Sequence, residues 1–379
     1  MEYVSLKDVC KINMGQSPDS SSYNTDCQGI PFFQGNADFG ERYPVTRVWC
    51  NAPTKIAEKN DILISVRAPI GALNYAKETC CIGRGLAALT PDINKVSPEF
   101  LYWFLKGKNA EFNKQGTGST FKAISKKVLE ETKVPNIPLN EQEKYSTMLE
   151  KLYLIIQTRR TQLEKLDELI KARFVEMFGD VATEQYKFPT CKLGNIANVG
   201  SSHRVFTTEF VENGIPFYRG TEIGELANGH KPTEPFYISE EHYNRIANDE
   251  TKPKYGDLLL PSICNKGQVW MVDTNEPFYY KDGRVLCISV DRDKYNTRFL
   301  QIFMREKTII EYPKLGSGST FAEFKIFLLK DIDVLTPPLE LQNQFADFVT
   351  QIDKSKVAVQ KALDEAQLLF DSLMQEYFG

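Results

Sequence analysis

The sequence predicts an α+β fold in which one unit occurs twice: two similar mixed α/β domains, each followed by a long helix. Three observations indicate it: an internal repeat, short apolar runs bounded by glycine and proline in each copy, and two long segments largely free of both residues. We expect the domains at 1–140 and 180–340 and the helices at 141–179 and 341–379. The helices should pack antiparallel as a coiled coil, with the copies related by a pseudo-twofold axis.

The repeat is clearest in a glycine-rich hexapeptide. Gly-Thr-Gly-Ser-Thr-Phe at 116–121 recurs as Gly-Ser-Gly-Ser-Thr-Phe at 316–321, and the offset of 200 holds to the final Phe-Gly. Towards the N-terminus the offset drifts, because most insertions fall in 36–60 of the first copy, opposite 221–256 of the second. Two copies indicate two related binding sites, with the divergent segments discriminating between ligands. Simple drift of surface loops is the alternative.

The first part of each copy mixes strands and short helices. Apolar runs at 61–66 and 256–260 are bounded by Gly, Pro or Asn, as strands are. Helical patterns follow at 98–106 and 297–307. We therefore expect a compact domain with a twisted sheet.

The second part of each copy is one helix. Residues 141–178 contain neither Gly nor Pro; Asn140 is expected to cap the start, with Glu143 returning the bond, and Gly179 follows the end. Apolar residues recur every three or four positions, which is typical of coiled-coil packing. These residues are Leu149, Leu152, Ile156, Leu163, Leu166 and Ile170 in the first helix and Val349, Ile352, Val359, Leu363, Phe370 and Leu373 in the second.

Such a helix is about 57 Å long at 1.5 Å per residue, too long for the core of one domain. The first helix should carry the chain from one domain to the other, and the second should return beside it. The predicted molecule has two heads on a paired-helix spacer. The alternative is a dimer in which each helix pairs with a helix of another chain.

Composition narrows the class of protein. The chain has 379 residues, 42% of them hydrophobic, and no apolar run long enough to span a membrane. The N-terminus lacks a signal-peptide pattern, and the eight cysteines include no CxxC pair, so free thiols in a reducing cytoplasm are expected. The three histidines share no ligand spacing with the cysteines, so no metal site is expected.

Charge is unevenly distributed. The formal net charge is −4, with +3 on residues 1–179 and −7 on residues 180–379, so a nucleic-acid interface would have to be a local patch. Basic residues flank the glycine-rich loop in both copies, as phosphate contacts would; a solvated helix face is the alternative. They are Lys106, Lys108, Lys114, Lys122, Lys126 and Lys127 in the first copy and Arg305, Lys307, Lys314, Lys325 and Lys330 in the second.

No catalytic motif is complete. Thr336-Pro337-Pro338-Leu339 resembles an amino-methyltransferase motif, but lacks the acceptor side chain at its first position and the stacking aromatic at its fourth. No glycine-rich cofactor loop follows a strand, no Walker loop occurs, and the Glu-x-Lys triplets lack a partner Asp. We expect no catalytic residues and no cofactor.

The order of motifs, given twice, resembles a known family. Each copy has an opening like Val4–Val9, a Gly-Ile-Pro-Phe segment, a Gly-Asp-Leu-Leu-Leu type strand, a Gly-Ser-Thr-Phe loop and a helix start like Pro-Leu-Asn-Glu-Gln at 138–142. The second copy departs from this pattern at 261–264 and 338–342. Over essentially the whole chain the series resembles the specificity (S) subunit of Type I restriction-modification systems.

This resemblance implies a function. Each domain would be a target recognition domain that reads one half of a bipartite sequence in double-stranded DNA. The helices would set the unread gap and dock two methyltransferase (modification) subunits, and restriction (motor-nuclease) subunits would complete the assembly. Reading by half-site spacing agrees with how dimeric DNA-binding proteins work.

Candidate contacts follow from the chemistry of readout. Arg, Lys, Gln and Asn pair with bases, whereas hydroxyls, backbone amides and lysines bind phosphates. Arg84 and Arg284 match at an offset of 200, which would also suit a structural salt bridge, and the hydroxyl-rich loops would also suit ordinary turns. The candidates are Gln16, Ser17, Arg67, Arg84, Thr117, Ser119, Thr120, Lys122 and Lys126 in the first copy and Arg204, Arg219, Lys266, Gln268, Arg284, Ser317, Ser319, Thr320 and Lys325 in the second.

A second function class stays open. A non-catalytic scaffold that binds two protein partners through its paired heads would need no DNA contact. The acidic second half is the observation that favours it.

Overall fold

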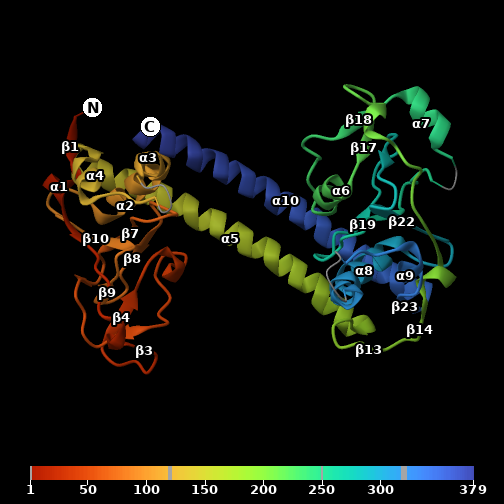
Figure 1. Cartoon of the computed structure of the whole chain (residues 1–379), viewed down its shortest axis with the longest axis horizontal. Helices are drawn as coiled ribbons and strands as arrows, with labels where there is room; N and C mark the ends of the chain where they lie inside the picture. Colours follow the sequence, from red (N-terminus) through yellow and green to blue (C-terminus); the bar gives the residue numbers. More distant parts are fainter. Residues whose placement is uncertain (1, 118–121, 249–250, 317–321) are drawn as a thin grey trace. The chain divides into compact units, whose positions relative to one another are not determined.

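A computed structural model describes residues 2–117, 122–248, 251–316 and 322–379. The chain divides into two compact units, the first formed by Met1–Thr161 with Gln360–Gly379 and the second by Gln162–Val359 (Figure 1). Each unit holds one mixed domain and one end of each long helix, α5 (Leu139–Phe178) and α10 (Leu339–Phe378). Within the described residues, no helix combines the length and apolarity that a membrane span requires.

The first unit contains two main sheets. The antiparallel sheet has the order β2 (Cys10–Met14), β10 (Leu86–Pro91), β7 (Ile62–Ser65), β8 (Leu73–Tyr75). The mixed sheet has the order β3 (Tyr23–Asn24), β5 (Trp49–Cys50), β4 (Ile30–Phe33), β9 (Cys80–Ile82), β6 (Ile56–Ala57). A short ladder joins β1 (Tyr3–Ser5) to β11 (Lys133–Pro135). The helices are α1 (Leu6–Val9), α2 (Pro98–Gly107), α3 (Asn109–Gln115) and α4 (Lys126–Glu131).

The core of the first unit lies around α2. Residues 100–105 are all buried, so this helix is covered on every side. Ser97 caps it by accepting a hydrogen bond from the Phe100 backbone N–H, and Pro98 occupies its first turn, as favourable N-termini do. The Trp103 ring meets Tyr153 of α5 and Phe370 of α10 edge to face, so the domain and both helix ends share one core.

The second unit repeats this topology. Its antiparallel sheet has the order β15 (Ala197–Gly200), β22 (Val285–Val290), β19 (Leu258–Pro261), β20 (Trp270–Met271). Its mixed sheet has the order β16 (Phe210–Val211), β18 (Phe236–Ile238), β17 (Ile215–Tyr218), β21 (Tyr279–Tyr280). Short ladders join β14 (Thr190–Lys192) to β23 (Asp333–Leu335) and β12 (Gly179–Asp180) to β13 (Gln185–Tyr186). The helices are α6 (Gly220–Ala227), α7 (Glu240–Ile246), α8 (Thr297–Glu311) and α9 (Ile326–Lys330).

The duplication extends to strand register. Ile62 lies opposite Leu89 in the first unit, as Leu258 lies opposite Ile288 in the second. The parallel pair β4–β9 has its counterpart in β17–β21. The units differ in the segment where the sequence repeat drifts: 36–60 begins with a 3-10 turn, η2 (Asn36–Asp38), whereas 221–256 contains most of α6 and all of α7.

The long helices pack antiparallel within each unit. In the first unit, Tyr145 stacks on Tyr377 with ring centroids 3.9 Å apart, and in the second, Phe174 meets Phe345 at 5.4 Å. All twelve predicted stripe residues are buried or half-buried. The chain's own two helices therefore cover each other's apolar stripes, which the dimer alternative did not predict.

The expected cap of α5 is wrong. The helix begins at Leu139, and the carbonyl of Pro138 accepts the backbone N–H groups of Glu141 and Gln142 at 3.0 Å, so Asn140 lies inside the first turn. Gly179 ends the helix as expected, with a φ of 98° that favours glycine.

Candidate nucleic-acid interface

In the first domain, three predicted contact residues lie around the hydroxyl of Ser17. The Ser17 Oγ lies 3.1 Å from Gln34 Oε1 and 2.9 Å from Gln34 Nε2, and it accepts the backbone N–H of Arg84 at 3.3 Å. Gln16 precedes it and is exposed, with its carbonyl bonded to the Thr54 hydroxyl. We call Gln16, Ser17, Gln34 and Arg84 the Ser17 cluster; its amide, hydroxyl and guanidinium groups suit base edges or phosphates.

Glycines allow the loops of the Ser17 cluster to meet. A Cβ on Gly15 would lie 2.2 Å from the Gly83 carbonyl oxygen, and one on Gly85 would lie 2.5 Å from that of Gln34. No other residue fits so close to backbone, so these positions need glycine. The Gly-Arg-Gly sequence at 83–85 is thus the local signal that marks Arg84.

The backbone connects Arg67 to the Ser17 cluster. The Val66 N–H donates to the Gly85 carbonyl at 2.9 Å, and the Ala68 N–H donates to the Lys122 carbonyl at 3.2 Å. Arg67 and Thr117 each form a β-bridge with Ala123. Arg67, Thr117 and Lys122 are exposed, so the first domain presents two further cations and a hydroxyl in this region.

In the second domain, three predicted residues line one groove. It has a cavity volume of about 460 Å³ and lies between the start of α6, the end of β19 and the loops before β20 and β22. We call it the Arg284 groove. Its lining residues are Arg219, Gly220, Thr221, Pro261, Ser262, Ile263, Gln268, Lys281 and Arg284.

Hydrogen bonds orient the polar groups of the Arg284 groove. The Arg219 guanidinium bonds Glu222 and lies 4.4 Å from the Phe236 ring centroid. Burial would raise the pKa of Glu222, but the bonds from the Arg219 side chain and backbone lower it, so this carboxylate stays charged. Gln268 Oε1 accepts the Lys266 backbone N–H at 3.0 Å, which brings Lys266 beside the groove.

A carboxylate links two predicted cations at the edge of the Arg284 groove. Glu323 pairs with the Arg284 guanidinium through Oε1 and with Lys325 Nζ at 2.7 Å through Oε2. The hydrogen bond from Lys325, with the charge of Arg284, lowers the pKa of Glu323. Arg204 lies nearby, because it pairs at 3.4 Å with Asp282, which is next in the chain to Lys281.

The predicted match of Arg84 with Arg284 is wrong by one residue. The Val66 N–H donates to the Gly85 carbonyl, whereas its counterpart, the Ser262 N–H, donates to the Arg284 carbonyl. Strand pairing agrees: Leu86 pairs with Ser65, and Val285 pairs with Pro261. Arg284 therefore occupies the position of Gly85. Arg84 and Arg284 lie just before β10 and β22, at positions that differ by one residue between the two copies.

Two of the predicted basic residues contact other side chains of their own unit. Lys106 Nζ lies 4.8 Å from the Tyr153 ring centroid, and buried Lys307 pairs with Glu184 at 2.6 Å and Glu311 at 3.0 Å. The phosphate-patch interpretation is therefore wrong for Lys307, because carboxylates already pair with its buried charge; for Lys106, which is exposed, it stays a prediction. Lys126 pairs along α4 with Glu130 at 3.1 Å, as the solvated-helix alternative predicts.

Five predicted hydroxyl residues lie outside the described part of the chain. They are Ser119, Thr120, Ser317, Ser319 and Thr320.

Comparisons with known proteins concern the family and fold of the chain. The family model described as the Type I restriction modification DNA specificity domain matches residues 1–168. The MjaIX specificity subunit of a type I restriction enzyme from Methanocaldococcus jannaschii is 24% identical over 97% of this chain and 90% of its own length. The chain is thus similar to Type I specificity subunits along most of its length, and the match to the DNA specificity domain covers its first 168 residues.

Two further relatives define how far the likeness extends. A protein of the same organism assigned as the MjaX specificity subunit is 43% identical, but the match covers 42% of this chain and 38% of that protein. The crystal structure of the Type I S subunit from M. genitalium, at 16% identity, has a TM-score of 0.59 over 100% of this chain and 96% of its own. The second likeness shows that the whole chain has the S-subunit fold.

Some residues of the candidate interface of this chain could not be found from its sequence. Gln34 joins the Ser17 cluster from the residue after β4, and Thr221 and Lys281 join the Arg284 groove from the start of α6 and the end of β21. Glu323 belongs to a Glu-x-Lys triplet in the sequence, and its pairing with Arg284 has no sequence signal. Among the described residues, no group of His, Cys, Asp and Glu could hold a metal ion.

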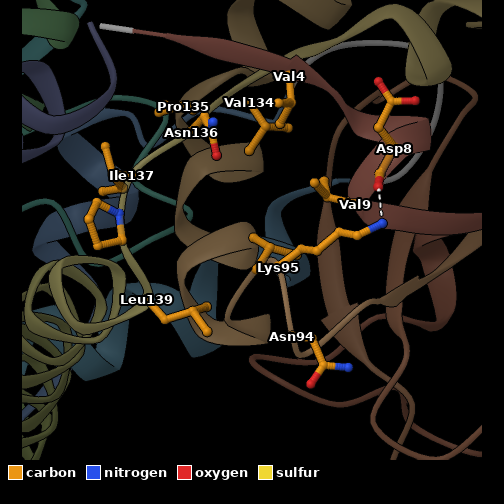
Figure 2. Close-up of a pocket in the computed structure, with 12 residues that line it drawn as sticks. Val4, Asp8, Val9, Asn94, Lys95, Val134, Pro135, Asn136, Ile137 and Leu139 are labelled. Carbon is orange, nitrogen blue, oxygen red and sulfur yellow. Dashed lines mark hydrogen bonds between the residues drawn. The ribbon is translucent and has the colours of Figure 1, made fainter.

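A further cavity in the first unit has a different character. It measures about 500 Å³ and lies between β1, β11 and the start of α5 (Figure 2). Its lining is largely apolar, with Val9, Val134 and Ile137 among its residues, and the Lys95 ammonium donates to the Asp8 carbonyl at 3.0 Å. None of the predicted DNA contacts lines it, so it is separate from the Ser17 cluster.

Proposed function

We propose that this protein is the non-catalytic DNA specificity subunit of a cytoplasmic Type I restriction-modification complex. Each domain would read one half of a bipartite sequence in double-stranded DNA. The observation that carries the proposal is the recurrence of an exposed arginine, with a glutamine in the same site, just before the corresponding strands β10 and β22 in two domains of one topology. Arginine and glutamine are the side chains that pair bidentately with guanine and adenine.

We propose a separate role for the long helices α5 and α10. They would set the unread gap and dock two methyltransferase subunits, to which restriction subunits would be added. Exposed apolar residues on the helix surfaces support a protein contact there, since such residues mark interaction sites when they gather. They are Met148, Leu154, Ile155, Leu368 and Leu369 in the first unit and Leu169, Val175 and Val357 in the second.

Salt-dependent DNA binding tests this function. The chain, alone and with its cognate methyltransferase subunit, is titrated against random duplex DNA in mobility-shift assays at 50 to 200 mM salt. The assembled complex should bind and lose affinity steeply as salt rises, because phosphate contacts release counterions.

An absent or salt-insensitive interaction in that complex would instead favour the two-headed protein scaffold. The charge of −7 on residues 180–379 is the observation that keeps this second candidate. Affinity purification of the intact chain with its neighbouring gene products would then identify the partners.

A further inference from the structure

Arg42 lies in a cage of aromatic rings at the surface of α5. Its guanidinium carbon is 4.6 Å from the ring centroid of Tyr102, 5.0 Å from those of Trp103 and Tyr153, and 5.8 Å from that of Tyr75. These rings come from β8, α2 and α5, so one side chain joins three elements. We call this set the Arg42 cage.

A carboxylate of the long helix completes the Arg42 cage. Arg42 Nη2 pairs with Glu150 of α5, and the Tyr153 hydroxyl donates at 3.1 Å to Glu41, the residue before Arg42. The Arg42 carbonyl accepts the Tyr75 backbone N–H at 2.8 Å. Two successive residues, Glu41 and Arg42, are thus bonded to α5 on one side and to the sheet on the other.

The chemistry of Arg42 suits a rigid tether. A guanidinium is planar and stacks on aromatic faces while its fork holds a carboxylate, which a lysine cannot reproduce. Burial alone would lower the pKa of Arg42, but the hydrogen bonds to Glu150 and Tyr102, together with the charges of these groups, raise it, so the cation is permanent. Among the described residues, none accepts a hydrogen bond from Arg42 Nη1, which leaves the ring faces as its surroundings.

The second unit tethers its domain differently. There Arg298, on the first turn of α8, pairs with Asp353 of α10. Asp353 occupies the helix position that matches Tyr153 at the offset of 200. In the second unit the arginine that pairs with the long helix lies on α8. In the first unit it lies in segment 36–60, in which the two copies diverge.

We propose that Arg42 is a positioning residue for DNA recognition. By holding segment 36–60 on Glu150 and Tyr153, it fixes how the first domain sits on α5, and so fixes the distance from the first half-site to the gap. This inference rests on the proposed function. Gap length would then depend on the contacts of Arg42 with Glu150 and Tyr153 as well as on the length of the helices.

Methylation mapping tests the inference. The full chain is expressed with its cognate methyltransferase subunit, and long-read sequencing identifies the modified sites and their gap lengths. Arg42→Gln removes the cation, Arg42→Lys keeps a charge over the rings without the fork, and Glu150→Gln removes the paired carboxylate. Arg47→Gln is the matched control, because Arg47 lies in the same segment and donates to the Ala37 carbonyl instead.

We expect the wild type and Arg47→Gln to modify sites of one gap length. Arg42→Gln should also modify sites with a gap one base pair longer or shorter, with the preference for the original gap lowered about thirtyfold, the size of effect expected from one desolvated cation–π contact. Arg42→Lys and Glu150→Gln should give smaller shifts in the same direction. The bases of both half-sites should stay unchanged.

Unchanged gap discrimination in folded Arg42→Gln would overturn the inference, as would loss of first half-site bases at an unchanged gap. If Arg42→Gln fails to accumulate, Arg42→Lys and Glu150→Gln decide by the same readout. A wild-type complex that modifies no bipartite sequence would overturn the proposed function itself.

Discussion

Glu323 is the residue whose charge most directly opposes DNA binding in the second domain. It holds both Arg284 and Lys325, two cations that would otherwise face a phosphate or base. We predict that Glu323→Gln raises affinity for duplex DNA about fivefold, the factor for about 1 kcal/mol, and that the gain shrinks as salt rises.

Fluorescence anisotropy with the assembled complex measures this effect. Arg284→Gln is the opposing variant and should weaken binding, by about 1–3 kcal/mol if Arg284 reads a guanine. Equal affinities for Glu323→Gln and wild type would show that the ion pair does not compete with DNA.

The cysteines allow a pH-dependent prediction. All eight are free; burial raises the pKa of Cys264 to about 11 and those of Cys10 and Cys80 to about 12, whereas Cys27 is exposed. Raised thiol pKa values leave little thiolate at pH 8, so Cys264 should alkylate on the order of 10²-fold more slowly than Cys27, and Cys10 and Cys80 on the order of 10³-fold more slowly. Mass spectrometry after iodoacetamide treatment at pH 7 to 9 checks this; rapid labelling of Cys264 in the folded protein would contradict its burial.

Residue chemistry was predictable from sequence only where the backbone itself required it. Glycines beside Arg84 marked a close approach, and that position joined the Ser17 cluster. Lys307 looks like a surface lysine in sequence, yet it is buried, and its partner Glu184 lies far away along the chain. Partners set by tertiary packing leave no local pattern.

At the scale of elements, the core of the second unit depends on α5. Phe174 packs against Phe178, Phe299, Phe303 and Phe345. We predict that Phe174→Ala lowers the free energy of unfolding by about 3–5 kcal/mol, the usual cost of deleting a buried phenyl ring.

The adjacent residue supplies the control. Val175 is exposed on the same helix, so Val175→Ala should change the free energy of unfolding by less than about 0.5 kcal/mol. Urea unfolding followed by circular dichroism measures both variants. Similar losses from the two would mean that α5 does not bury its Phe174 face.

The long helices were predictable because nothing in 141–178 interrupts them, but strand register was not. The offset of 200 applies from the hexapeptide onwards, whereas β10 and β22 align at 199. Between these strands and the hexapeptide, the first copy breaks its helix at Lys108, where α2 ends and α3 begins, whereas α8 runs without a break to Glu311. Sequence alone could not place that break, because both copies are apolar and helical there.

At the scale of the whole molecule, the duplication predicts independent half-sites. Exchanging residues 1–140 for the first domain of another specificity subunit should change one half of the modified sequence and leave the other. Long-read methylation mapping reports the result. A change in the far half-site would count against independent reading.

Helix length gives a second prediction at this scale. Adding one heptad to both α5 and α10 keeps the apolar stripes in register and should lengthen the gap, because a heptad adds about 10 Å of helix. Insertion in α5 alone would put the stripes out of step and is the control. Modified sites with the original gap after the paired insertion would exclude the helices as its determinant.

The pairing of Arg42 with Glu150 has a practical consequence for building chimeras. A junction at residue 140 leaves Glu150 and Tyr153 with the recipient, so a donor that lacks an equivalent arginine would leave that carboxylate without its partner. Moving the crossover beyond Tyr153 transfers the whole cage as one piece. Chimeras joined beyond Tyr153 should therefore modify sites of a single gap length, whereas chimeras joined at residue 140 should modify sites of more than one gap length.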